Sequence, residues 1–357
     1  MFEVMRGWMN RFLSTEEAVL LAVILIVSSV VILTMGKILA PLLTGIVLAY
    51  VMQGSIKMFE RLKIPNIIAV WCTFLLFMGG FIGVLLFVIP KVWRQMRALF
   101  DNLPSMVHEA QILLQQLPKT YPQLFSEQTV NGWSDVLSTE AGDIGQWLVS
   151  TSIAQLPLIM TVTIYIMLIP LIVFFLLKDQ EQITGWYLSY LPAKRPLLDR
   201  IGAEMHVQMA NYIRGKVLEI ILVGTATYIF FKITGLNYGA LLAFIVGLSV
   251  VVPYVGIVAV SIPVVIIAWL QFGFSADFVY IMVGYSIIQA LDGLLVVPLL
   301  FSEAVNLHPI AIITAILVFG SWWGLWGVFF AIPLATLIKA VMKSWPQGQW
   351  HSTEDGA

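Results

Sequence analysis

The sequence predicts an all-α polytopic membrane protein with about eight membrane-embedded units, and three observations support this fold class. Apolar residues make up 60% of the 357 residues and charged residues 11%, against about 45–50% and 25% in soluble domains. Several stretches without Asp, Glu, Lys or Arg approach or exceed the roughly 20 residues with which a helix crosses a bilayer. Glycine and proline interrupt long apolar segments in the last third, which predicts interrupted or re-entrant helical hairpins.

Residues 1–90 form the first region, which we predict to contain three spans. Their apolar cores cover residues 18–33, 38–56 and 64–89. A cleaved signal peptide would be followed by polar mature sequence, whereas the first apolar stretch is followed almost at once by a second one. The first stretch is therefore predicted to be a span.

The middle of the chain alternates between polar and apolar regions. Residues 91–155 are charged at first and show helical spacing of apolar side chains, which predicts an extracytoplasmic segment of short amphipathic helices. Residues 156–177 follow as a fourth span, with Pro170 as a kink. Residues 178–216 are again polar and carry an apolar stripe typical of a cytoplasmic interfacial helix.

The last third contains two units, residues 217–272 and 278–338, each with one span followed by one hairpin. The proposed helix breaks are Pro253, Tyr254 and Gly256 in the first unit and Gly320, Gly324 and Gly327 in the second. Each arm of the second hairpin has about 13 residues and covers only about 20 Å, so we expect it to be re-entrant. The first hairpin is longer, and either a re-entrant hairpin or two tilted spans would fit it. Residues 339–357 are predicted to form a cytoplasmic tail.

These two units resemble each other at an offset near 70 residues. Three sets of residues align: Leu236 and Asn237 with Leu307 and His308, Gly256 with Gly327, and Pro263 with Pro333. Each unit has an odd number of crossings, so the second copy would be inverted relative to the first, a pattern typical of secondary transporters. The alternative is that two apolar sequences align by chance.

The distribution of Lys and Arg predicts the orientation. If the N-terminus is cytoplasmic, thirteen Lys and Arg fall in the cytoplasmic segments and six in the others. The positive-inside rule then places both termini in the cytoplasm and residues 91–143 outside it.

Several function classes lack their sequence signals. The net charge of −1 leaves no basic surplus for a nucleic-acid backbone. The single cysteine, Cys72, excludes an intramolecular disulfide and a CxxC metal site. No Walker A loop, HExxH motif or nucleophile elbow is present in the sequence. We therefore expect no enzyme activity, no metal and no cofactor; the expected partners are the lipid bilayer and a small polar solute or monovalent cation.

Ionisable residues within the predicted spans are the candidate functional residues, because a charge at membrane depth is costly unless it faces a cavity or a partner. Asp292 lies deepest, with Gln289 one turn before it on the same face, and Glu219 and Glu303 lie nearer the span ends. Two cations, Arg214 and Lys216, are close enough in sequence to share the environment of Glu219. These groups would bind a proton, a cation or a solute; the alternative is a structural ion pair or snorkelling to the headgroups.

His308 and the glycines at the second break are weaker candidates. His308 opens the second hairpin and could titrate near neutral pH, although capping a helix explains it equally well. Gly320, Gly324 and Gly327 could free backbone groups for a ligand, although close helix packing is the alternative explanation.

Four groups of residues after residue 178 together carry a family resemblance. They are the run Asn211, Tyr212, Ile213, Arg214, Gly215 and Lys216; the Pro253, Tyr254, Val255 and Gly256 break; Gln289, Asp292, Gly293, Pro298, Glu303, Asn306, Leu307, His308 and Pro309; and Gly327, Ala331, Ile332 and Pro333. In this order they resemble the autoinducer-2 exporter family of bacterial membrane proteins. No single motif is diagnostic, but their order and spacing together are specific, and the likeness covers nearly the whole chain.

The resemblance implies an inner-membrane permease with about eight spans and raises the expectation of a homo-oligomer. It also makes Asn306 a candidate solute- or ion-binding residue. The family has been linked both to signal export and to sodium/proton antiport, so the expected function is export of a small polar solute such as autoinducer-2, with an antiporter as the alternative. A non-transporting membrane scaffold is the alternative from another class.

Overall fold

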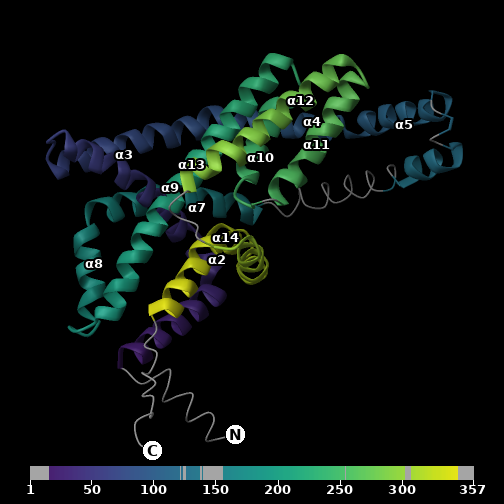
Figure 1. The fold of residues 1–357 in the computed structure, drawn as a ribbon. Coiled ribbons are helices and arrows are strands. Elements are labelled where there is room, and N and C mark those ends of the chain that lie inside the picture. The colour runs from purple at the N-terminus through teal and green to yellow at the C-terminus, as the bar shows by residue number, and fades with distance from the viewer. Residues whose placement is uncertain are drawn as a thin grey trace, which may run out of the picture. The chain divides into compact units, whose positions relative to one another are not determined.

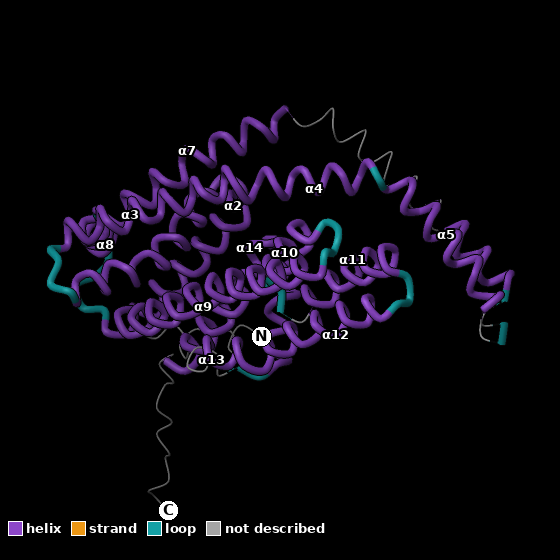
Figure 2. The backbone as a smooth tube through the Cα atoms, turned by 90° about the horizontal axis from the view of Figure 1, so that it is seen from above, coloured by secondary structure: helices purple, strands orange, loops and turns teal. Residues whose placement is uncertain are grey.

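The computed structural model describes residues 16–120, 122–123, 126–136, 139, 156–253, 255–301 and 307–344. Helix is the only regular secondary structure within these residues (Figures 1 and 2). Eight of the described helical segments are long and apolar enough to cross a membrane: Glu16–Gly36, Ile38–Arg61, Asn66–Asp101, Met160–Lys178, Pro196–Thr234, Val255–Phe272, Ala276–Phe301 and Pro309–Lys343. This confirms the predicted all-α polytopic membrane fold.

The chain divides into two compact units. Unit 1 comprises Met1–Gly54, Ile172–Gly215 and Phe301–Ala357, and unit 2 comprises Ser55–Leu171 and Lys216–Leu300. The divisions fall inside or at the end of four helices: α2 (Glu16–Arg61), α7 (Leu156–Lys178), α9 (Pro196–Thr234) and α13 (Val297–Phe301).

Unit 1 contains most of α2, the start of α9, the short helix α8 (Gln180–Ser189) and α14 (Pro309–Ser344). Glu17 at the start of α2 accepts a hydrogen bond from the Leu197 backbone nitrogen at 3.0 Å. The Tyr212 hydroxyl donates to the Phe329 carbonyl at 2.8 Å, which joins α9 to α14. The Trp323 ring lies so close to Gly36 that a Cβ there would be 2.1 Å from the indole nitrogen, so α2 and α14 also pack together.

α2 joins the first two predicted spans into one helix of 46 residues. At 1.5 Å per residue it is about 70 Å long, roughly twice the thickness of a bilayer core. Both predicted spans are present as the candidate spans Glu16–Gly36 and Ile38–Arg61, with Lys37 between them. No loop separates them, because a lysine alone does not end a helix.

α9 likewise joins two elements that the sequence analysis separated. The predicted interfacial helix and the span from Val217 both lie in this continuous helix of 39 residues. Gly215 lies between the two predicted elements, and one glycine weakens a helix by only about 1 kcal/mol relative to alanine. α7 is also helical on both sides of Pro170.

Unit 2 contains α3 (Asn66–Gly83), the π-helical turn η1 (Val84–Val88), α4 (Ile89–Asp101) and α5 (Leu103–Thr120). Helix therefore continues from the third predicted span through Pro90 into the amphipathic segment. Unit 2 also contains α10 (Gly239–Ser249), α11 (Val255–Phe272), α12 (Ala276–Leu291) and the π-helical turn η2 (Asp292–Val296). The end of α2, the start of α7, α9 from Lys216 onward and most of α13 belong to it as well.

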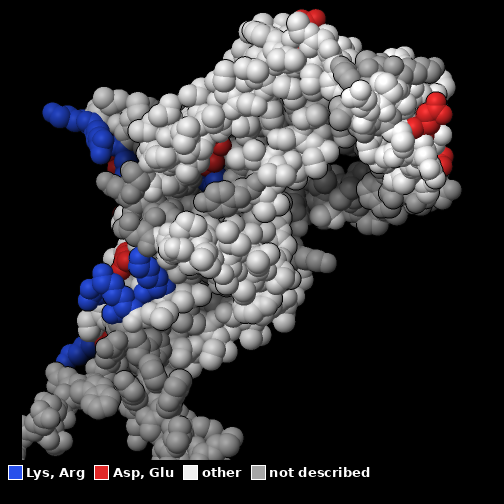
Figure 3. Space-filling model, turned by 45° about the vertical axis from the view of Figure 1, so that its right-hand side comes forward, with Lys and Arg blue, Asp and Glu red and all other residues white. Residues whose placement is uncertain are grey.

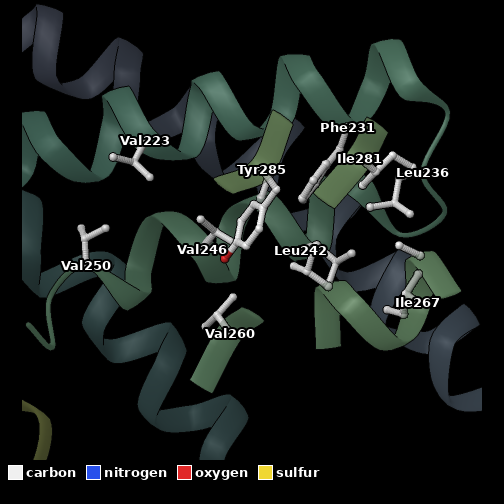
Figure 4. Close-up of a cluster of buried hydrophobic side chains, with 13 residues drawn as sticks. Val223, Phe231, Leu236, Leu242, Val246, Val250, Val260, Ile267, Ile281 and Tyr285 are labelled. Carbon is white, nitrogen blue, oxygen red and sulfur yellow. The ribbon is translucent and has the colours of Figure 1, made fainter. Parts of the chain in front are cut away.

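A cluster of buried apolar side chains holds unit 2 together (Figure 4). It extends from Val223 and Val250 at one end to Leu236, Ile267 and Ile281 at the other. Its members come from α9, α10, α11 and α12 and from the turns that follow α9 and α10. The cluster therefore packs the four helices against one another, and we call it the apolar plug.

The helical conformation is interrupted in both of the segments where breaks were predicted. α10 ends at Ser249 and α11 begins at Val255, and the Cα of Gly256 lies so close to the Ser249 carbonyl that a Cβ would be 1.9 Å from its oxygen. In α14, Gly324 leaves the helical conformation with φ 60° and ψ −136°. Gly327 then lies against the Phe319 carbonyl, where a Cβ would be 1.8 Å from the oxygen. The chain doubles back at both breaks.

α10 has only 11 residues and is about 17 Å long, too short to cross a bilayer core of about 30 Å. The first arm of the first hairpin thus has the length of a re-entrant helix. The inverted relation between the two hairpins stays a prediction. Gly256 and Gly327, which are 71 positions apart, each lie close to a preceding carbonyl oxygen.

Many large apolar side chains are exposed among the described residues, and the face drawn in Figure 3 shows few charged side chains between uncharged ones. Leu299 is 78% exposed and Phe87 75% exposed. A soluble protein rarely leaves large apolar patches in water, so these side chains are placed for contact with lipid.

Candidate functional site

Three buried ionisable residues lie together in unit 2. Lys216 and Glu219 lie on α9, and Asp292 begins η2 at the end of α12. Their exposed fractions are 4%, 2% and 3%. Asp292 interacts electrostatically with both α9 residues. The structure therefore brings together three of the residues that the sequence marked as candidates, and we call them the charge cluster.

Lys216 has two acceptors in this cluster. Its Nζ atom donates to Glu219 Oε2 at 2.7 Å and to the Val250 carbonyl at 2.8 Å. Val250 directly follows α10, at the first helix break. The ammonium group of Lys216 thus links an ion pair within α9 to the interrupted end of a neighbouring helix.

Asp292 and Gln289 each have a buried polar atom without a hydrogen-bond partner in the described part of the chain. These atoms are Asp292 Oδ1 and Gln289 Nε2. A buried polar atom without a partner is rare and destabilising, and ionised groups are more costly than neutral ones. Asp292 also begins a π-helical turn, a local distortion frequently found at functional sites. This combination marks Asp292 as the strongest candidate to bind an ion or proton.

A polar stripe on α12 leads from Asp292 toward the apolar plug. Tyr285, Gln289 and Asp292 follow one another at spacings of four and three residues, which places them on one face of the helix. Tyr285 belongs to the plug (Figure 4). Its hydroxyl lies 3.1 Å from Ser261 Oγ. The plug therefore closes this face of α12 beyond Gln289.

Arg214 does not join the charge cluster. It belongs to unit 1, where its Nε atom donates to the Tyr50 carbonyl at 3.1 Å. Residues two apart in a helix point about 200° away from each other, so Arg214 and Lys216 face opposite sides of α9.

The remaining predicted residues lie at or beyond the helix ends. The Nδ1 atom of His308 accepts a hydrogen bond from the Ile310 backbone nitrogen at 3.3 Å, at the start of α14, which is a capping contact. The structure describes five of the predicted break residues, and all of them lie at or near the two breaks: Pro253, Gly256, Gly320, Gly324 and Gly327. Glu303, Asn306 and Tyr254 lie outside the described residues.

Unit 1 also contains a polar cavity that no motif in the sequence indicates. It has a volume of about 220 Å³, and its polar lining comes from Tyr50, Gln53, Gln180, Thr184 and His206. The Tyr50 hydroxyl lies 3.2 Å from His206 Nδ1. These residues lie on α2, α8 and α9, far apart in sequence, so no local motif could have pointed to them.

In the described part of the chain, no group of three or more His, Cys, Asp or Glu is placed to hold a metal ion. The charge cluster itself offers two carboxylates and one ammonium group, and the chemistry of these groups is proton exchange and ion pairing.

Comparison with known proteins identifies the family. The family described as AI-2E family transporter matches residues 19–347. The chain belongs to this family. A relative named "Putative permease PerM" from Escherichia coli (strain K12) is 43% identical over 349 residues, which cover 98% of this chain and 99% of the relative.

Less similar relatives also align along most of the chain. "Putative transport protein YueF" from Bacillus subtilis (strain 168) is 28% identical over 307 residues, 84% of this chain and 82% of the relative. "Putative transport protein YrrI" from the same organism is 24% identical over 321 residues, 87% of each chain. The protein is thus a multi-pass membrane protein of a bacterial transport family.

Proposed function

We propose that this protein is a secondary transporter that exports a small polar solute and is driven by a proton or sodium gradient acting on the charge cluster. The observation that supports this most directly is the buried Oδ1 atom of Asp292, which has no hydrogen-bond partner in the described chain, close to the Lys216–Glu219 ion pair. Intramembrane ionisable groups of this kind are found on ion pathways and proton relays.

The geometry provides a coupling mechanism. With Asp292 protonated, Lys216 needs to neutralise only Glu219, and it also donates to the Val250 carbonyl as observed. Loss of the proton creates a second buried carboxylate, which attracts the ammonium group of Lys216 away from Val250. The carbonyl at the end of α10 then loses its donor. Proton binding would in this way change the stability of the first hairpin.

The apolar plug is the proposed gate. One end of the plug lies beside the charge cluster. Val250 at this end accepts the hydrogen bond from Lys216, and Val223 lies one helical turn after Glu219 on α9. A polar solute cannot pass packed apolar side chains, so transport requires the four helices of the plug to separate.

A neutral, hydrogen-bonding solute fits the polar groups available. The unit 1 cavity is lined by two amides, two hydroxyls and an imidazole, and Gln289 offers a further unpartnered amide. Autoinducer-2 is a small polyhydroxylated furanone and is the solute that the family description favours. We place the protein in the bacterial inner membrane with both termini cytoplasmic, and we expect a homo-oligomer.

The test is uptake of labelled autoinducer-2 into inside-out vesicles, with and without an imposed proton gradient. Wild-type protein should show gradient-dependent uptake and Asp292→Asn should lose it. Asp277→Asn is the matched control, since Asp277 is an exposed carboxylate at the start of the same helix. Equal uptake by Asp292→Asn and wild type would overturn the coupling role, and uptake no higher than in empty vesicles would overturn the solute.

A sodium/proton antiporter is the second candidate, because the charge cluster contains two buried carboxylates, and a carboxylate can bind a proton and a sodium ion in alternation. Sodium added to acid-loaded inside-out vesicles should then release protons, detected with a pH-sensitive dye, and Asp292→Asn should abolish the release. If neither assay detects transport, the non-transporting membrane scaffold is the remaining candidate function.

A further inference from the structure

Unit 2 contains a second, larger hollow that plays no part in the proposed coupling. It is a groove of about 560 Å³, within the range of small-molecule sites. Its walls come from the η1 and α4 region, from α9 and from α10. Apolar side chains make up most of the lining, including Val84, Phe87, Ile221 and Leu248.

Small residues create this groove. The backbones of α9 and α10 cross closely at Gly224 and Gly247, where a Cβ on Gly247 would lie 3.0 Å from the Cα of Gly224. Ala240 and Ala243 extend the small-residue surface on α10. Larger side chains from α9, α10 and the η1 and α4 region surround these small residues and leave a space that no protein atom of unit 2 fills.

Positive charge is concentrated at one part of the groove. Lys91 lines it and donates a hydrogen bond to the hydroxyl of Tyr228, which also lines it. Lys232, one helical turn after Tyr228 on α9, interacts electrostatically with the same hydroxyl. None of the ion pairs found within the described residues includes Lys91 or Lys232. Both ammonium groups therefore remain available to an anion.

Trp93, beside the groove on α4, is 41% exposed and carries the Arg97 guanidinium 5.0 Å from its ring centre. Exposed tryptophan with flanking cations is typical of the headgroup level of a membrane. The cationic end of the groove thus lies where phosphate groups of lipids would be found, and the apolar part leads toward the hydrocarbon.

We propose that this groove is a binding site for one anionic phospholipid. An acyl chain lies along Phe87, Ile221 and Leu248, and the phosphate lies between Lys91 and Lys232. An apolar trough with cations at one end matches an anionic amphiphile, whereas a polar solute would leave the apolar walls unused. This proposal is independent of the transported solute and of the charge cluster.

Native mass spectrometry of the purified full chain tests the proposal with phosphatidylglycerol and phosphatidylcholine offered at equal concentration. Each basic residue near a headgroup adds about 1 kcal/mol to the binding of an anionic lipid, so wild type should retain phosphatidylglycerol at least about tenfold better. The double variant Lys91→Gln/Lys232→Gln should lose this preference. The control Lys57→Gln/Arg61→Gln removes the same number of positive charges from exposed positions near the end of α2 in unit 2 that do not line the groove, and it should keep the preference.

A second variant tests the apolar part without removing charge. Thr225 lines the groove and its side chain is exposed, so Thr225→Trp should fill the space without disturbing buried packing, and both lipids should be displaced. This variant decides the matter if the double variant does not fold. Equal phosphatidylglycerol retention in all variants would overturn the proposal. So would a Thr225→Trp protein that keeps its lipid but changes its subunit number, because a second copy of the chain would then occupy the groove.

Discussion

At the scale of single residues, the charge cluster combines a satisfied ion pair with an unsatisfied carboxylate. Lys216 and Glu219 stabilise each other at 2.7 Å with almost no solvent exposure. Removal of one partner from a buried pair leaves an uncompensated charge, whereas removal of both can be nearly neutral.

Lys216→Met should therefore destabilise the folded protein by about 3–5 kcal/mol. The double variant Lys216→Met/Glu219→Gln should recover a large part of that loss, because no buried charge is left from the pair. Thermal unfolding in detergent measures both. A double variant less stable than Lys216→Met would show that the hydrogen bond to Val250, rather than the charge balance, is what Lys216 contributes.

Asp292→Asn, unlike Lys216→Met, should leave the stability of the protein unchanged or higher and still remove its activity. A neutral amide removes the cost of burying an ionisable carboxyl group, so the melting temperature should stay the same or rise while coupled transport is lost. Thermal unfolding and the vesicle assay on the same preparation check this. A fall in melting temperature as large as that of Lys216→Met would indicate that Asp292 is a structural residue.

At the scale of elements, the two helix breaks depend on the absence of a side chain. Gly256 and Gly327 each lie against a carbonyl oxygen of the preceding arm, at distances that no Cβ tolerates. Backbone atoms cannot move aside as the end of a flexible side chain can, so the turn itself would have to open.

Gly256→Ala and Gly327→Ala should each reduce the yield of folded protein severely. Gly79→Ala on α3 is the control, because nothing lies within 4 Å of its Cβ position, and alanine there should be neutral or stabilising by about 0.5–1 kcal/mol. Monodisperse protein after size-exclusion chromatography is the measurement. Normal yields for both break variants would show that the turns adapt.

At the scale of the whole molecule, the proposed transport function requires that some exposed apolar side chains meet lipid and that others line a water-accessible path. A transporter needs the second kind near its helix breaks, where backbone groups are freed from helical hydrogen bonds. Val255 and Leu325 lie at the two breaks and are exposed, as is Leu299 within the continuous helical run that leads from α12 into α13.

Val255→Cys and Leu325→Cys, each in a Cys72→Ser background, should react with a membrane-impermeant maleimide, because the reactive thiolate requires water. Leu299→Cys, the matched control, should stay unlabelled in the membrane and react once detergent and denaturant are added. Protection of both break positions in intact membranes would favour the scaffold. The breaks themselves are the places to probe, but Gly256 is unsuitable for cysteine because of its contact with Ser249.

The sequence by itself determined the class of protein and the approximate spans, and it showed a lone carboxylate, Asp292, within an apolar run and glycines and a proline within two long apolar segments. These follow from one-dimensional information: a bilayer requires runs of about 20 apolar residues, glycine and proline interrupt helices, and a charge within an apolar run is costly wherever the chain folds. Family membership could also be inferred, because its motifs recur in order along the chain.

Only the tertiary structure decided which of these residues meet. Helical periodicity gives the face on which a side chain lies but not the element that packs against it. The hydrogen bond from Lys216 to Val250 therefore cannot be predicted from the sequence. Arg214 is close to Glu219 in sequence, but it contacts Tyr50 instead. The polar cavity and the lipid groove depend on residues from several helices that come together only on packing. Contacts between distant segments are set by how helices pack, and local sequence carries no direct record of them.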